Sequence, residues 1–205
     1  METRKAPKAA LRNRRVFTAL FAALIAVSCI VQLAAGPFAV VPLVLQNMMA
    51  LLAGGLLGGL GGAASVLLFV VAGALGLPVY AGGRGGIAIL LGPTGGFLIG
   101  YLLGSLVIGL LLGIPSCTET KSIARIVKTA AAGLAGFLAV YVPGLCWYAA
   151  SYVMKRDGSG FSAALVKALP EAFLPFIPGD LVKLVIFTLL TLALRPIAAR
   201  YINPD

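Results

Sequence analysis

The sequence is dominated by long apolar segments that carry almost no charge. Hydrophobic residues make up 60% of the 205 residues and charged residues only 11%, with a mean hydropathy of +1.06. An ordinary soluble domain carries about 25% charged residues. Lipid offers no hydrogen-bond partners to backbone N–H and C=O groups, so segments that cross it are expected to be helices. The chain is therefore predicted to be an all-α integral membrane protein.

Six segments are long and apolar enough to cross the hydrocarbon core, which takes about 20 residues. The fold class is therefore predicted to be a six-transmembrane-helix bundle. Residues 16–205 would form a single transmembrane domain, and residues 1–15 a basic N-terminal arm. A signal peptide is the competing interpretation of 1–29, but the apolar stretch continues past Cys29. The expected spans are 16–35, 43–60, 63–79, 95–114, 126–153 and 177–199.

The distribution of lysine and arginine predicts the orientation. With six spans, eleven of the 16 basic residues fall on the side that holds both termini, and five on the other. Both termini are therefore expected to be cytoplasmic. The net charge of +10 does not indicate nucleic-acid binding, because the basic residues flank apolar segments instead of forming one folded face.

The sequence lacks the residues that several kinds of catalysis, metal binding and ATP binding require. The chain has no histidine, its three cysteines are scattered, and no P-loop sequence for ATP is present. No cluster of carboxylates could hold a catalytic metal ion. We therefore expect no catalytic residue, metal site or cofactor, and favour a binder of small molecules over an enzyme.

Small residues recur at four-residue spacing, which lets helix backbones approach closely. Gly96, Gly100 and Gly104 are one such series, and similar glycines lie in 54–62. Packing inside the bundle is the expected role of the glycines. The pair Ala19 and Ala23 in the first span is a candidate surface for docking a partner.

Asp180 and Lys183 lie one helical turn apart at the start of the last apolar segment. Charges at membrane depth are costly and usually mark a functional site. Segments rich in glycine and proline are expected to be non-helical and to line a cavity on the same, outer side. These segments are 36–47, 76–86 continuing into 91–96, and 170–183.

Other polar and aromatic residues fall on this outer side, and all are candidates for binding one ligand. Each has a simpler alternative: a helix cap or ion pair for Asp180, an interfacial position for Lys183, and a solvated loop tip for Arg84. Interhelical hydrogen bonds or the aromatic belt would explain the rest. The candidate ligand-binding residues are Asp180, Lys183, Arg84, Gln46, Asn47, Tyr80 and Trp147.

Four stretches resemble the BioY family, the biotin-binding substrate-capture (S) components of energy-coupling-factor (ECF) transporters. They are VPLVLQ at 41–46, GLPVYAGG at 76–83, LGPTGGFLIG at 91–100 and PFIPGDLVK at 175–183. They occur in the family's order. Ala19 and Ala23 also resemble its Ala-x-x-x-Ala signature for docking on the transmembrane coupling subunit.

The resemblance implies an S-component fold of six helices with an outward-facing vitamin site, in the plasma membrane of a prokaryotic cell. It implies biotin as ligand. A site for biotin needs one cation for the carboxylate, and our hypothesis is that Lys183 or Arg84 supplies it. It also implies partners, a membrane coupling (T) subunit and two ABC-type ATPase subunits, which alone use ATP. An S component for another vitamin is the main alternative. A small membrane-embedded enzyme and a structural assembly protein are less favoured.

Overall fold

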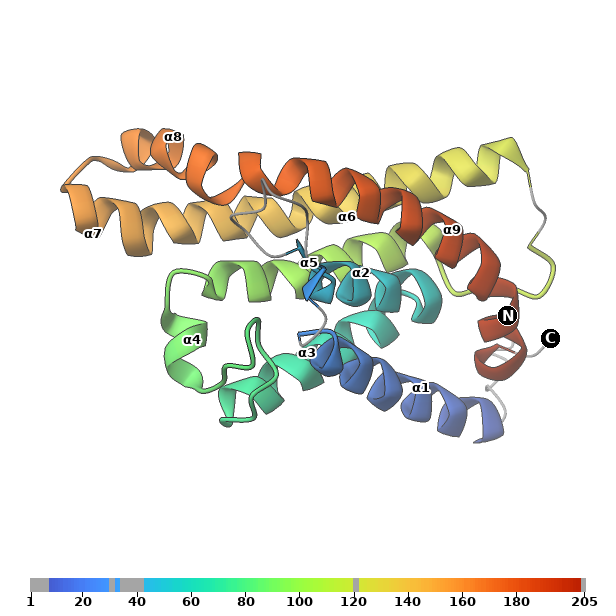
Figure 1. Ribbon diagram of the computed structural model, residues 1–205. Helices are drawn as coiled ribbons and strands as arrows, with labels where there is room; N and C mark the ends of the chain where they lie inside the picture. The colour runs from blue at the N-terminus through green and yellow to red at the C-terminus, as the bar shows by residue number, and fades with distance from the viewer. Residues whose placement is uncertain (1–7, 30–31, 34–42, 120–121, 204–205) are drawn as a thin grey trace, which may run out of the picture.

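The computed structural model describes residues 8–29, 32–33, 43–119 and 122–203. Two-residue strands, β1 (Gln32–Leu33) and β2 (Leu43–Val44), pair in antiparallel fashion, and the rest of the regular structure is helical (Figure 1). The helices are α1 (Lys8–Val27), α2 (Gln46–Leu57), α3 (Gly59–Ala74), α4 (Ile87–Leu91), α5 (Gly95–Leu112), α6 (Ile123–Tyr148), α7 (Met154–Asp157), α8 (Phe161–Ala172) and α9 (Ile177–Ile202). A π-helical segment (Ala149–Val153) joins α6 to α7, and a 3-10 turn (Leu174–Phe176) precedes α9.

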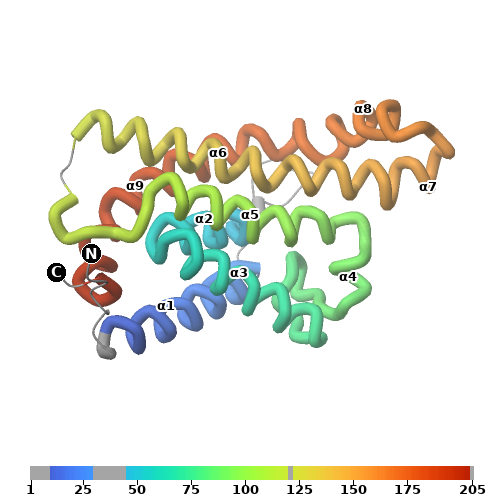
Figure 2. The backbone as a smooth tube through the Cα atoms, turned by 180° about the vertical axis from the view of Figure 1, so that it is seen from behind, coloured from blue at the N-terminus to red at the C-terminus, as the bar shows by residue number. Residues whose placement is uncertain are grey.

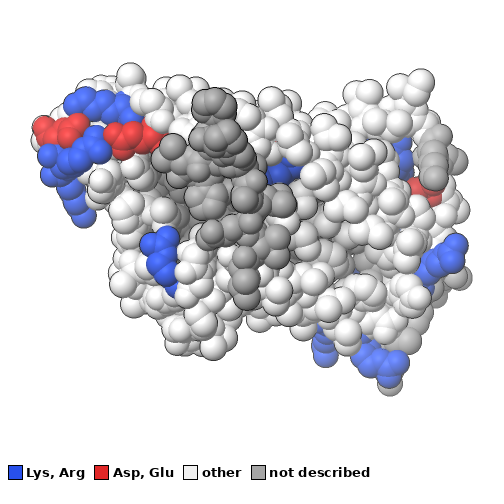
Figure 3. All heavy atoms as spheres, viewed as in Figure 1, with Lys and Arg blue, Asp and Glu red and all other residues white. Residues whose placement is uncertain are grey.

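The all-helical membrane architecture is confirmed. Within the described part of the chain, three helical stretches have the length and composition to cross a membrane: Gly95–Leu112, Ile123–Asp157 and Phe161–Ile202. In Figure 3 the charged side chains gather toward two ends of the visible face, and few lie between them.

The predicted ends of the first three spans were wrong. Helix α1 begins at Lys8 and ends at Val27, whereas 16–35 was expected. Arginine, lysine and alanine favour helix, so α1 extends through 8–15 instead of starting where the charge stops. Residues 1–7 of the expected arm lie outside the described residues, as do 30–31 and 34–42.

The segment 170–183 is largely helical, which corrects the expectation of an irregular loop. Helix α8 continues to Ala172 with Pro170 inside it, and Pro178 lies in the first turn of α9, where proline is tolerated. Gly158, with φ of 64°, reverses the chain between α7 and α8. The resulting hairpin projects past the rest of the bundle (Figures 1 and 2).

The predicted role of the glycines in packing inside the bundle is confirmed. A Cβ added at Gly54 of α2 would overlap the backbone of Ser105 in α5, and one at Gly62 of α3 would overlap Gly54. One at Gly100 of α5 would overlap Val140 of α6. Helices α2, α3, α5 and α6 therefore touch through their backbones and form a rigid frame around the cavity described below.

Helices α2 and α3 form a short hairpin. Their 12 and 16 residues correspond to about 18 and 24 Å, less than the hydrocarbon thickness of about 30 Å. The chain reverses between them at Gly58, with φ of 78°. Helices α1 and α9 extend beyond this turn toward the chain termini (Figures 1 and 2).

A buried arginine lies where the hairpin ends. Arg195 of α9 is 1% exposed and donates hydrogen bonds to the Gly55 carbonyl at the end of α2 and the Leu112 carbonyl at the end of α5. Its guanidinium also pairs with Glu119, at 2.8 Å. The sequence analysis counted Arg195 among the basic residues on the side with the termini. Its side chain is buried and caps carbonyls at the ends of two helices.

The first turns of α1 and the last turn of α9 lie side by side. Asn13 Nδ2 donates to the Tyr201 carbonyl at 3.0 Å, and Arg14 Nε donates to the Ile202 carbonyl at 2.8 Å. The start of α1 and the end of α9 therefore lie on one side of the molecule, which we call the termini side.

Candidate functional site

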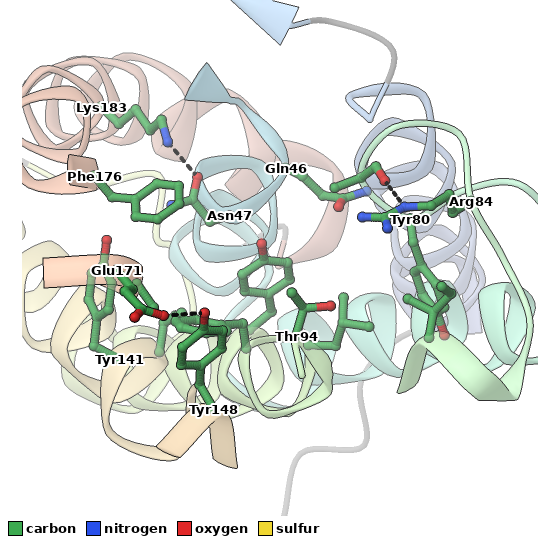
Figure 4. A pocket seen from close by; sticks show the side chains of 17 residues that line it. Gln46, Asn47, Tyr80, Arg84, Thr94, Tyr141, Tyr148, Glu171, Phe176 and Lys183 are labelled. Carbon is green, nitrogen blue, oxygen red and sulfur yellow. Dashed lines mark hydrogen bonds between the residues drawn. The ribbon is translucent and has the colours of Figure 1, made fainter. Parts of the chain in front are cut away.

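A cavity of about 250 Å³ lies within the half of the molecule remote from the termini (Figure 4). Residues of α2, α5, α6 and α9 form its walls, and the 80–84 turn and the end of α8 contribute to its rim. Of the seven predicted ligand-binding residues, five line it: Gln46, Asn47, Tyr80, Arg84 and Lys183.

Asp180 and Lys183 form a buried ion pair. Lys183 Nζ lies 2.9 Å from Asp180 Oδ1, and the two side chains are 4% and 9% exposed. Lys183 is therefore not at the interface, and Asp180 lies inside the first turn of α9, not at its N-cap. These two simpler interpretations are wrong, whereas the i,i+3 ion pair is present.

Asn47 and Tyr141 complete this network. Asn47 Nδ2 donates to Asp180 Oδ1 at 3.1 Å, and Asn47 Oδ1 accepts from Lys183 Nζ at 3.1 Å. The Tyr141 hydroxyl donates to Asp180 Oδ2. Asp180 does not itself line the cavity, but it binds three side chains that do. An ammonium has three N–H donors, and two of those on Lys183 have acceptors among the described residues, which leaves one for a ligand.

Gln46 presents an unpaired acceptor. Its Nε2 donates to the carbonyls of Val79, at 2.7 Å, and Ile25, at 3.3 Å, which fixes the amide. Its Oε1 is buried and has no hydrogen-bond partner among the described residues. Since an unsatisfied buried acceptor costs about 1–3 kcal/mol, a ligand N–H that reached it would be stabilised.

Tyr80 and Arg84 close a tight turn at the other end of the cavity. The Tyr80 amide donates to the Arg84 carbonyl at 2.8 Å, and the intervening Gly83 has φ of 68°. Tyr80 is 1% exposed, and its hydroxyl donates to the Val70 carbonyl. The Arg84 side chain is exposed, with Nε donating to the Ala81 carbonyl at 3.1 Å. Figure 4 shows Arg84 and Lys183 at opposite ends of the cavity.

Trp147 does not line the cavity, so the structure does not support the prediction that it binds the ligand. Its indole N–H donates to the Gly92 carbonyl at 2.9 Å, and its Cβ packs against Gly96. This hydrogen bond and this contact hold α6 against the start of α5. Its sequence position indicated the correct end of the molecule but not the direction of its ring.

The sequence interpretation missed twelve lining residues, five of them aromatic. Tyr141 packs edge-on against Phe97 and Phe173, with ring centroids 6.1 and 4.7 Å apart. Tyrosines inside an otherwise apolar helix were the available signal, because a buried hydroxyl needs a partner. The missed lining residues with polar or aromatic side chains are Thr94, Phe97, Tyr101, Tyr141, Tyr148, Glu171 and Phe176.

The lining as a whole suits an elongated small molecule with polar groups at both ends. The rest of the lining includes apolar and aromatic side chains, among them Leu98, Tyr101 and Val140. Such a lining with few polar groups is typical of small-molecule sites. In the described part of the chain, no three His, Cys, Asp or Glu side chains come together as metal ligands.

The predicted docking pair lies on the outside of α1. Both Ala19 and Ala23 are exposed, while Phe21 and Ile25, on another face of the helix, are buried. The two alanines therefore remain available to a partner protein.

Comparisons with known proteins give a consistent result. The sequence model of the BioY family matches residues 2–200. A biotin transporter BioY from Thermotoga maritima is 36% identical over 176 residues, covering 86% of this chain and 92% of the relative. One from Rhizobium etli is 35% identical over 176 residues, covering 85% and 89%.

One solved structure agrees with the fold. A crystal structure described as the S-component for biotin from an ECF-type ABC transporter superposes with a TM-score of 0.69 at 28% identity, covering 92% of this chain and 94% of the other. The chain is therefore a member of the BioY family.

Proposed function

We propose that this protein is the biotin-binding S component of an ECF transporter, located in the prokaryotic plasma membrane. The observation that carries the proposal is the cavity with fixed polar groups at both ends. Biotin has the matching shape, with a polar ureido ring at one end and a carboxylate at the other. The relatives' names also describe transporters of biotin, not enzymes.

The carboxylate of biotin would bind at the Arg84 end. The guanidinium is exposed at the rim, and only its Nε has a hydrogen-bond partner among the described residues. At the opposite end the Asp180 carboxylate neutralises Lys183, so an anion there would meet no net positive charge. A charge-assisted hydrogen bond contributes about 1.5–3 kcal/mol.

The ureido ring would bind at the Lys183 end. The remaining N–H of Lys183 can donate to the ureido oxygen, whereas Gln46 lies toward the Arg84 end of the cavity (Figure 4). Asp180 would act by orienting Lys183 and Asn47, since both of its oxygens already accept hydrogen bonds. Tyr80 and Tyr101 would contact the apolar part of the ligand.

Uptake would need partners: a T subunit and two ABC-type ATPase subunits, which alone would use ATP. The T subunit would dock on the α1 face at Ala19 and Ala23. It would reorient the whole bundle so that the cavity opens inward. Both chain termini would lie in the cytoplasm, consistent with their position together on one side of the molecule.

The test is biotin binding to purified variants in detergent. Lys183→Ala and Asp180→Asn should each weaken binding by about 10- to 150-fold, from the loss of a charge-assisted hydrogen bond. Lys167→Ala is the matched control, because this exposed lysine pairs with Asp157 and does not line the cavity. Unchanged affinity in both Lys183→Ala and Asp180→Asn would remove this assignment of the site.

A second ligand tests the two ends of the cavity separately. Arg84→Gln should weaken the binding of biotin. It should leave the binding of biotin's primary amide, which has no carboxylate, nearly unchanged. Equal losses for both ligands would place the carboxylate elsewhere. Other vitamins serve as a panel in thermal-shift measurements. A rise in melting temperature with another vitamin and not with biotin would show a different S component.

A further inference from the structure

A second hollow lies on the termini side of the molecule. It is a groove of about 510 Å³ between α1, the α2–α3 turn, the end of α5 and the end of α9. We call it the termini-side groove. It shares no lining residue with the first cavity.

The short α2–α3 hairpin creates this groove. Because the hairpin turns back at Gly58 while α1 and α9 continue, the space beyond the turn has no helix to fill it. The start of α3 and the facing end of α5 add few side chains, since Gly59, Gly61 and Gly109 line the groove. The termini-side groove therefore exists because α2 and α3 are shorter than α1 and α9.

The groove opens toward lipid. The side chains of Leu60 and Leu110, which line it, are 84% and 69% exposed. At membrane depth such apolar surface contacts hydrocarbon and not water. An empty hollow of this size would lose dispersion contacts on every wall, so an acyl chain that enters it is stabilised.

Arg14 places a positive charge at the same groove. Its Nε is held by the Ile202 carbonyl at 2.8 Å, and its terminal N–H groups have no partner among the described residues. Arg12 and Arg15 on α1 are exposed, as is Arg200 on α9. Basic pockets between transmembrane helices on the cytoplasmic side favour anionic lipid headgroups.

We propose that the termini-side groove binds one anionic phospholipid. One acyl chain lies along Leu57 and Leu110, and the phosphate accepts hydrogen bonds from the terminal N–H groups of Arg14. The acyl chain supplies contact area and the phosphate supplies selectivity. Charge complementarity favours this occupant over a second copy of the chain, which would bring its own arginines to the same place.

The experiment titrates the full-length protein, purified in a neutral detergent, with phosphatidylglycerol or with phosphatidylcholine of the same acyl chains. Native mass spectrometry counts the bound lipids. One phosphatidylglycerol should bind at least about 10-fold more tightly than phosphatidylcholine, because only its charged phosphate is not balanced by a choline. Arg14→Gln should remove most of this preference, and Arg14→Lys should keep most of it.

Arg15→Gln is the matched control, since it removes the same charge from an exposed position that does not line the groove. Equal loss of preference in Arg14→Gln and Arg15→Gln would overturn the site in favour of general surface attraction. Thr18→Phe, which fills the groove and keeps Arg14, should lower binding of both lipids. Unchanged binding in Thr18→Phe, or a dimer in place of a lipid adduct, would also overturn the proposal.

Melting temperatures measured without added lipid separate misfolding from a lost site. A variant that melts as the parent does and still loses the phosphatidylglycerol preference supports the proposal. Biotin binding in the same preparations is an independent readout, because the two hollows share no residue.

Discussion

At the scale of single residues, Arg195 connects several elements of the termini side. It caps the ends of α2 and α5 and pairs with Glu119, which also pairs with Arg125 of α6. Burial alone would raise the pKa of Glu119, but hydrogen bonds from Arg195 and Arg125 lower it below its ordinary value. Glu119 therefore stays ionised at neutral pH. Its ion pairs with Arg195 and Arg125, together with the hydrogen bonds of Arg195, link α2, α5, α6 and α9.

Arg195→Leu should destabilise the protein by about 3–5 kcal/mol, the usual cost of breaking a buried ion pair from one side. It leaves the last carbonyls of α2 and α5 without donors. Thermal unfolding in detergent measures the effect. Arg200→Leu is the control, because Arg200 is exposed on the same helix. Equal melting temperatures for the two variants would contradict the capping role.

The two ion pairs differ in how far sequence could reveal them. Asp180 and Lys183 are three residues apart in an apolar segment, so helical periodicity alone predicted their contact. Arg195 and Glu119 are 76 positions apart. Only the packing of α9 against the ends of α2 and α5 brings them together, and no local pattern records that packing. The direction of the Trp147 ring was unpredictable for the same reason.

At the scale of elements, hydropathy located the membrane segments but not their ends. Helix α1 begins eight residues before the expected span, because its basic first turns are as helical as its apolar ones. Helix α8 was not expected at all. It is too short to cross the membrane and carries Lys167, Pro170 and Glu171, so a search for membrane spans passes over it. Only its packing against α6 and the π-helical segment shows what its apolar face buries.

Helix α1 also carries a prediction of its own. Ala19→Trp or Ala23→Trp should leave biotin binding unchanged and abolish biotin uptake, because a bulky ring would hold the T subunit away from this face. Leu189→Trp is the control, since Leu189 is exposed on a different helix, α9. Binding and uptake are measured with labelled biotin, in detergent and in cells respectively. Uptake that survives both alanine substitutions would show that the docking surface lies elsewhere.

At the scale of the whole molecule, the neighbouring ends of α1 and α9 allow the orientation to be tested with a native cysteine. Cys117 is exposed in the α5–α6 connection on the termini side, whereas Cys29 is buried and Cys146 lies within the α6 span. A membrane-impermeant maleimide should therefore label Cys117 in inside-out vesicles and not in intact cells.

The opposite end provides the control for orientation. Ser162 is exposed at the start of α8, so Ser162→Cys in a Cys117→Ser background should be labelled in intact cells. Labelling of Cys117 from outside would invert the proposed orientation. The fold itself would be unaffected, because either orientation buries the same helices.

The pairing of Asp180 with Lys183 has an electrical consequence. A lone charge that crossed the membrane would gain or lose about 2.3 kcal/mol for each 100 mV of transmembrane voltage. Two opposite charges held 2.9 Å apart move together, and the voltage performs almost no net work on them. A protein that carries this pair across the bilayer can therefore do so at any membrane potential.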